Sequence, residues 1–374
     1  MLKKFEKQPI LYWTLELLAL AMLILVVAQL KFIFDPIGKF VGAVFVPVII
    51  SGFLYYLLNP FVMTLQKIPL TKTQKLPRWL AITLVMIIAA TVVALGGILL
   101  IPKLINQLVK LATAMPGLIH SGQNFIDQAA NWDFVQKVSH QIDMNQFNTK
   151  LQHMAGNMVN GLADSMTNLL GMVTSITIVA VTVPVMTIYM LADGNKLVPF
   201  LKKLFPKNQQ DNVEDIFGRL NFTISKYIVG QAIEMLFVAV FTTAGYFMIG
   251  QNYALLLGVA AGIANIIPYV GPYIGIVPAL FVAFIQSPWQ FVWVIIVVLI
   301  VQQIDGNLLY PRIIGATLNI HPMTIIIILL AAGNIAGIPG MILAIPMYAV
   351  VRTLAVYAWE LLHLQDSVQG DEAA

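Results

Sequence analysis

The sequence contains no cysteine and carries little charge for its length. None of its 374 residues is a cysteine, which excludes disulfide bonds, thiolate metal sites and a cysteine nucleophile. Only 10% of the residues are charged, against roughly 25% in a typical soluble domain, whereas 59% are hydrophobic. Several apolar runs are long enough to cross a bilayer, so the composition indicates an all-α polytopic membrane protein.

Common enzyme motifs are also missing from the sequence. It has no G-x-x-x-x-G-K-[ST] phosphate loop, no H-E-x-x-H zinc motif and no G-x-S-x-G nucleophile elbow. We therefore expect no enzyme activity, no cofactor and no metal site. The net charge of +4 lies mostly on short loops, which membrane topology explains better than nucleic-acid binding does.

Apolar runs predict about eight membrane segments. They lie at about 10–34, 40–58, 79–101, 166–191, 227–249, 253–284, 289–304 and 322–362. The intervening loops at 59–78 and 192–226 are basic, so the positive-inside rule places both loops in the cytoplasm. The basic N-terminus is also expected in the cytoplasm, and the predicted crossings return the C-terminus to the same side.

These runs divide the chain into six regions. We expect spans 1–3 at 1–101, an extracytoplasmic amphipathic helical region at 102–165, span 4 at 166–191, a cytoplasmic amphipathic helical loop at 192–226, a transport core at 227–363 and a disordered tail at 364–374. Asp193 and Gly194 follow the apolar run of span 4, and we expect them to end its helix.

Two apolar segments of the core are interrupted by glycine and proline. They read GVAAGIANIIPYVGPYIGIVPA at 258–279 and IIILLAAGNIAGIPGMILAIP at 326–346. A helix break survives in hydrocarbon only where protein or a water-filled cavity satisfies the freed backbone groups. Paired broken segments are typical of binding sites in secondary transporters, although glycine and proline are common in membrane helices generally.

The two broken segments leave two topologies open. In the first, all eight segments are simple spans and the polar joint at 305–321 lies outside. In the second, both broken segments are re-entrant hairpins that enter from opposite faces, and the joint lies inside. Arg312 is the only basic residue of the joint, and it favours the inside placement.

Few ionisable side chains lie within the predicted spans, where they are costly and therefore functional candidates. Glu234 lies about two turns into the fifth span, on the same helix face as Gln231. A carboxylate enclosed in an apolar cavity can exchange protons near neutral pH, as ion coupling requires. The alternative is a structural hydrogen bond. Asp305, with Gln302 and Asn307 nearby, could coordinate a cation or cap a turn.

The breaks also carry neutral hydrogen-bonding groups that suit a small polar ligand. The candidate substrate-binding residues are Asn265, Pro268, Tyr269, Gly271, Pro272 and Asn334. The candidate hinge or packing positions are Gly275, Pro278, Gly333, Gly337, Gly340 and Pro346. Close helix packing explains the glycines at least as well as a hinge does.

The run NIIPYVGPYIGIVPA at 265–279 resembles the signature of the AI-2E transporter family, the autoinducer-2 exporters. YMLADG at 189–194, Gly230 with Gln231, and the closing motif at 333–346 are similar to further family motifs in the same order. The joint also matches, although a glutamate often stands where this chain has Asp305. The similarity extends over roughly residues 10–360.

The resemblance implies a homo-oligomer, a pentamer, with about eight membrane segments per chain, in a bacterial cell membrane. It implies a secondary transporter that exports a small polar signalling metabolite such as autoinducer-2, used in quorum sensing. Other members look like Na⁺(Li⁺)/H⁺ antiporters, which is the alternative within the family. An alternative of another class is a non-transporting membrane scaffold.

Overall fold

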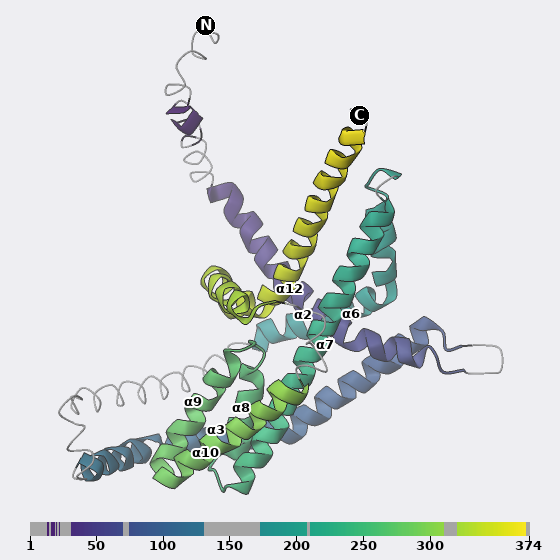
Figure 1. Ribbon diagram of the computed structural model, residues 1–374. Coiled ribbons are helices and arrows are strands. Elements are labelled where there is room, and N and C mark those ends of the chain that lie inside the picture. Colours follow the sequence, from purple (N-terminus) through teal and green to yellow (C-terminus); the bar gives the residue numbers. More distant parts are fainter. Residues whose placement is uncertain are drawn as a thin grey trace.

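The computed structural model describes residues 13–14, 16–18, 20, 22, 31–69, 75–130, 173–207, 210–309 and 320–371. Its helices are α2 (Lys31–Leu65), α3 (Arg78–Ala130), α6 (Val173–Lys202), α7 (Gln210–Met248), α8 (Ala254–Ala264), α9 (Gly271–Gln286), α10 (Pro288–Ile304), the π-helical turn η3 (Asp305–Leu309) and α12 (Pro322–Asp371) (Figure 1). Within these ranges the only β-pairing is an isolated bridge between Pro69 and Lys75.

Five described segments are long and apolar enough to cross a membrane. They are Gly42–Leu65, Arg78–Ala114, Gln210–Met248, Pro288–Leu309 and Pro322–Tyr357. The chain is therefore an all-α multi-pass membrane protein. Most of the predicted first span and part of the fourth fall outside the described residues, so the count of eight segments stays a prediction.

Several helices extend beyond the boundaries expected from the sequence. Helix α2 runs through 35–39, between two predicted spans, and α12 continues to Asp371 through the predicted tail. The prediction that Asp193 and Gly194 end a helix is wrong, because α6 continues to Lys202. Asp193 instead pairs with Lys196 one turn further on, at 2.5 Å. Residues 131–165 of the predicted outer region lie outside the described residues.

Helices α2, α3 and α6 pack together near the start of α3. Their shared core contains Val62, Ile82 and Leu191. Arg78 donates from Nε and Nη2 to the carbonyl oxygen of Leu191, at 3.0 and 2.7 Å. This charged donor fixes the first turn of α3 against the middle of α6.

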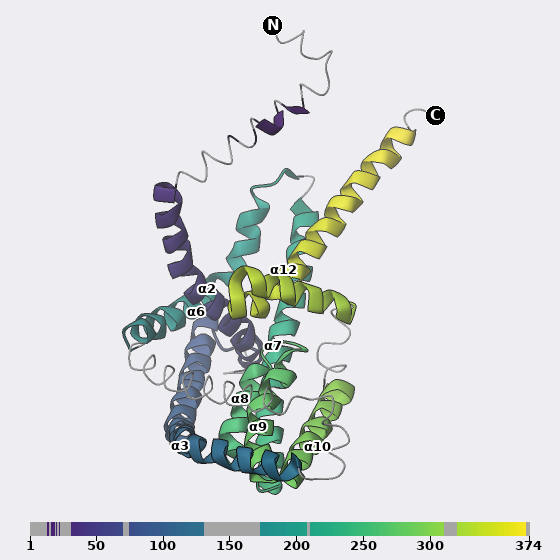
Figure 2. The same ribbon diagram turned by 90° about the vertical axis from the view of Figure 1, so that its left-hand side faces the viewer.

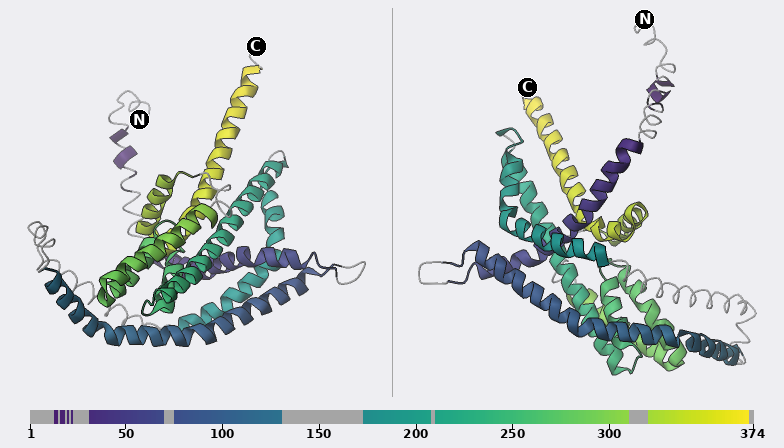
Figure 3. Two further views of the ribbon diagram at one scale, coloured as in Figure 1. Left: turned by 60° about the horizontal axis from the view of Figure 1, so that its bottom comes forward. Right: turned by 180° about the vertical axis from the view of Figure 1, so that it is seen from behind.

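Helices α7, α8, α9 and α10 form a second packed group, seen side by side in Figures 1 and 2. Small residues let consecutive helices pack backbone to backbone in antiparallel pairs. A Cβ on Gly262 of α8 would lie 2.7 Å from the Met235 carbonyl of α7, and one on Gly275 of α9 would lie 2.8 Å from Ala261 Cα of α8. Helix α3 is long and bowed and passes along this group, contacting α8 and α9 (Figure 3).

The first broken segment is a helical hairpin formed by α8 and α9. Its two ends lie together, because the backbone amide of Asn252 donates to Oε1 of Gln286 at 3.3 Å. Gln290 of α10 closes the same end through Ile249 O at 3.1 Å and Gln251 Oε1 at 2.9 Å. With 11 and 16 residues, both helices are shorter than the roughly 20 residues that a full crossing requires.

The second broken segment is a sharp kink within α12. Ala336 (φ −136°) and Gly337 (φ 61°) are non-helical, and the chain folds back there (Figure 2). Gly340 then lies so close to the Ala332 carbonyl that a side chain would not fit. Leu329 and Ala344, on either side of the kink, belong to one buried cluster that also contains Ile267 from the tip of the α8–α9 hairpin.

A glycine comparison tests whether backbone contact holds α8 against α7. We expect Gly262→Ala to lower the free energy of unfolding by about 1–3 kcal/mol, because the new methyl group meets rigid backbone atoms. The control is Gly218→Ala in α7, where the site is open and the better helix propensity of alanine should stabilise by up to about 1 kcal/mol. Unfolding in SDS, followed by tryptophan fluorescence, measures both. Equal effects of the two substitutions would contradict this account.

Candidate functional site

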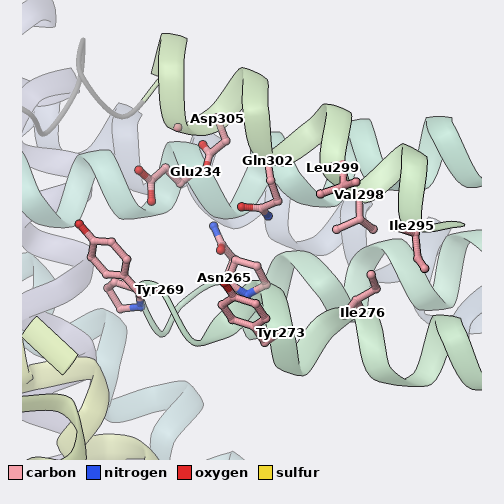
Figure 4. Close-up of a pocket in the computed structure, with 13 residues that line it drawn as sticks. Glu234, Asn265, Tyr269, Tyr273, Ile276, Ile295, Val298, Leu299, Gln302 and Asp305 are labelled. Carbon is pink, nitrogen blue, oxygen red and sulfur yellow. The ribbon is translucent and has the colours of Figure 1, made fainter. Parts of the chain in front are cut away.

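A cavity of about 520 Å³ lies between the tip of the α8–α9 hairpin, the middle of α7 and the end of α10. The residues that line it are Glu234, Asn265, Pro268, Tyr269, Pro272, Tyr273, Ile276, Ile295, Val298, Leu299, Gln302, Asp305 and Gly306 (Figure 4). The antiparallel packing of α10 on α7 brings Asp305 beside Glu234, although 71 residues separate them in the sequence. The cavity therefore joins the candidate ion-coupling residues to the first candidate substrate site.

Two carboxyl groups form the polar end of the cavity. Glu234 and Asp305 lie next to each other in Figure 4, and they are only 5% and 8% exposed. Glu234 Oε1 and Asp305 Oδ1 have no hydrogen-bond partner within the described part of the chain. No lysine, arginine or histidine is among the residues that line the cavity there. Two buried carboxylates without a counter-charge are unfavourable, so the pair needs a proton or a cation.

Gln231 connects this carboxyl pair to the hairpin tip. Its Nε2 donates to the carbonyl oxygen of Asn265 at 2.7 Å and lies 3.5 Å from Glu234 Oε2. Asn265 is the C-cap of α8, where carbonyl groups lose their helical partners. Gln231, 1% exposed, supplies one of the missing donors from the neighbouring helix.

The rest of the cavity is amphipathic. In Figure 4 the side-chain amides of Asn265 and Gln302 point toward each other beside the carboxyl pair. Tyr269 and Tyr273 add aromatic surface, and Tyr269 adopts a left-handed backbone conformation, with φ 61°, that is unusual for a bulky residue. The opposite end is aliphatic, with Ile276 from α9 and Ile295, Val298 and Leu299 from α10.

Some predicted site residues lie away from the cavity. Asn307 is exposed and donates to Gln303 Oε1 at 2.6 Å, and Asn334 is exposed on α12 and donates to the Leu330 carbonyl at 2.8 Å. Gly271, a candidate substrate-binding residue, begins α9 and is not among the residues that line the cavity. The candidate hinge or packing positions are distributed over the two hairpins: Gly275 and Pro278 lie in α9, and Gly333, Gly337, Gly340 and Pro346 lie in α12.

The space around each of these glycines indicates whether it allows close packing or a kink. A Cβ on Gly271 would collide with the Ala264 carbonyl, and one on Gly340 would collide with the Ala332 carbonyl. A Cβ on Gly333 would meet only the flexible end of Met341. Gly337 has a positive φ and no close neighbour, so it serves the kink rather than a contact.

Part of the cavity wall, formed by residues of α9 and α10, was not predicted from the sequence. Tyr273 and Ile276 lie on one face of α9, and Ile295, Val298 and Leu299 share the face of Gln302 on α10. Helical spacing of three and four residues from Gln302 is the signal that could have found the residues on α10.

Comparison with known proteins identifies the family. Residues 20–358 match the family described as AI-2E family transporter. The chain belongs to this family. YueF of Bacillus subtilis strain 168, named a putative transport protein, is 35% identical over 370 residues, 98% of each chain. PerM of Escherichia coli K12, named a putative permease, is 28% identical over 348 residues, covering 91% of this chain and 93% of its own.

Membership agrees with the resemblance drawn from the motif at 265–279. That motif forms the tip of the α8–α9 hairpin and the first turns of α9, and six of its residues line the cavity together with Glu234. The part of the sequence that identifies the family is therefore also part of the wall of the candidate site.

The variant Gln231→Leu tests whether this amide holds the hairpin tip. Removing the donor leaves the Asn265 carbonyl buried without its partner, so local opening should become about fivefold more frequent, corresponding to about 1 kcal/mol. Hydrogen exchange of residues 264–271 should rise, while exchange at the hairpin base around Gln251 stays unchanged. An even rise over α8, α9 and α10 would indicate general destabilisation and contradict the specific role.

Proposed function

We propose that the protein is a secondary transporter that couples its cargo to ion movement at the Glu234–Asp305 pair. The observation that carries this proposal is a pair of buried carboxyl groups that line one cavity at a helix break. Membership of a transporter family supports it. A non-transporting scaffold would have no use for buried carboxyl groups in a cavity whose described lining residues include no basic side chain.

Two cargoes fit this site. The first is a small polar metabolite such as autoinducer-2, exported from the cell. Its hydroxyl groups would bind the amides of Asn265 and Gln302 and the hydroxyl of Tyr269, while its carbon skeleton would rest on the aliphatic wall.

The second cargo is Na⁺ or Li⁺ exchanged for H⁺. Oxygen ligands suit hard cations, and the cavity offers two carboxyl groups with no basic side chain among its lining residues. Cation and proton would compete for the same oxygens, which is what antiport requires. This observation favours the ion as cargo over an anionic solute.

We also propose that both broken segments are re-entrant hairpins. The adjacent ends of α8 and α9 support this for the first segment, because a simple crossing would place them on opposite sides of the membrane. The fold-back at Gly337 supports it for α12. Transport would then involve movement of the hairpins relative to the α2–α3–α6 group.

Charge-neutral variants test the coupling. In vesicles that contain a pH dye, we expect Na⁺ to drive proton movement through the wild type, and Glu234→Gln and Asp305→Asn each to reduce it by at least about tenfold, because neither amide can exchange a proton or replace the carboxylate charge. The matched controls are Glu214→Gln and Asp215→Asn, two exposed positions on α7 outside the cavity.

The outcomes separate the two cargoes. Proton movement with Na⁺ and no organic solute identifies ion exchange, whereas movement that requires a polar solute identifies metabolite export. Full transport by both cavity variants would refute coupling at Glu234 and Asp305. The amount of folded protein inserted in the vesicles must match among variants, as measured by size-exclusion chromatography after extraction.

Single cysteines test the hairpin topology in this naturally cysteine-free chain. A cysteine at Asn252, exposed at the base of the first hairpin, should react from outside with a membrane-impermeant thiol reagent. It is a better external control than Gln251, which is buried and hydrogen-bonded to Gln290. Re-entrant hairpins predict that a cysteine at Asn319 is protected from outside and reacts after permeabilisation. Labelling of Asn319 in intact cells would restore the eight-simple-span topology.

A further inference from the structure

A second cavity, of about 390 Å³, lies where α3 passes the ends of α7 and α8. Its lining residues are Leu100, Lys103, Asn106, Gln107, Lys110, Phe247 and Leu255. None of them lines the cavity that contains Glu234 and Asp305. The transport proposal therefore leaves this site without a role.

Two lysines give this cavity its chemical character. Lys103 and Lys110 are seven residues apart, so they lie on one face of α3 about 10 Å from each other along the axis. Within the described residues, neither ammonium group forms an ion pair, and no acidic side chain lines the cavity. Such a pair attracts an anion.

The wall between the lysines is fixed to α8. Gln107 Oε1 accepts a hydrogen bond from the Leu256 amide at 2.9 Å, and the Tyr253 hydroxyl donates to the Lys110 carbonyl at 3.4 Å. Since its oxygen is engaged, Gln107 offers its NH₂ group to a ligand, as a donor. Asn106 supplies a second amide on the same wall.

The depth of the lysines matches the level of lipid headgroups. Twenty-four residues of α3 separate Trp79 from Lys103, about 36 Å of helix, which exceeds the roughly 30 Å hydrocarbon core. The opposite end of this helix meets the basic loop at 59–78. The cavity therefore falls on the membrane face away from the basic loops, where uncompensated lysines are unexpected.

The floor of the cavity is apolar and continuous with the outer surface of the helices. Leu100 is 42% exposed and Phe247 is 61% exposed, and Met248 beside it is 87% exposed. A free phosphate ion would gain nothing from this surface. A phospholipid would place its acyl chain along it while its phosphate meets the lysines.

We propose that this cavity binds the phosphate-bearing headgroup of an anionic phospholipid. Lys103 and Lys110 contact the phosphate oxygens, Asn106 and Gln107 contact the glycerol or headgroup hydroxyls, and an acyl chain lies over Leu100 and Phe247. The bound lipid joins α3 to the start of α8 and so supports the base of the α8–α9 hairpin. This site does not depend on which cargo is transported.

Lipid titration of the purified full-length protein tests the proposal. Native mass spectrometry would count phosphatidylglycerol molecules bound to the wild type, to Lys103→Gln/Lys110→Gln, and to a control with the same charge change, Lys203→Gln/Lys207→Gln, at two exposed positions outside the cavity. We expect the tightest phosphatidylglycerol to bind about thirtyfold more weakly to the cavity variant than to the control. Lys103→Arg/Lys110→Arg should restore binding.

Two further ligands test whether the site binds a phospholipid headgroup or a free phosphate ion. Phosphatidylcholine should bind weakly and show no dependence on Lys103 and Lys110, because its headgroup has no net charge. Inorganic phosphate should neither bind nor raise the unfolding temperature in a lysine-dependent manner. Lysine-dependent binding of inorganic phosphate without lipid preference would replace the lipid site by a free-anion site. Equal phosphatidylglycerol binding by the wild type and the cavity variant would refute the site.

Discussion

The hydrogen bond from Gln231 to the Asn265 carbonyl is the contact on which the candidate site depends. A helix that ends within hydrocarbon leaves carbonyl groups that water cannot reach, so a neighbouring helix must supply donors. Gln231 does so at 2.7 Å from α7. Because Glu234 lies one turn further on the same face, the residue that satisfies the break also borders the carboxyl pair. One side chain therefore contacts both the carboxyl pair and the hairpin tip.

Close backbone packing makes the hairpin move as a unit with α7. The Cβ positions on Gly262 and Gly275 are blocked by backbone atoms of the adjoining helix, and rigid neighbours of this kind do not slide past each other gradually. At the other end, Gln290 ties α10 to the α7–α8 turn. Any transport movement would accordingly take place outside this group, where α7 contacts α2 and α6.

The sequence predicted the helical class and both breaks because these follow from local chemistry: apolar runs form membrane helices, and Pro268 and Gly337 interrupt them. It also singled out Glu234 and Asp305, since ionisable residues are rare in apolar runs. The sequence did not predict that these two residues lie close together, because their proximity results from the antiparallel packing of α10 along α7. The expected helix end at Asp193 failed because a single glycine costs a helix only about 1 kcal/mol, and Gly194 packs against the Tyr55 ring of α2. Asn334 resembled Asn265 in its local sequence, but its helix does not reach the cavity.

The charge in the cavity restricts what can occupy it. In a low-dielectric interior two neighbouring carboxylates repel each other, which favours protonation of one of them or a shared cation. An anionic solute would add a third negative charge, and no lining side chain would compensate for it. A neutral polyhydroxylated solute adds no charge, and its hydroxyl groups can donate to the carboxyl oxygens. Under either proposed cargo, the carboxyl pair therefore binds a proton or a cation before or together with the cargo. Whether it binds H⁺ or Na⁺ determines which ion gradient drives transport.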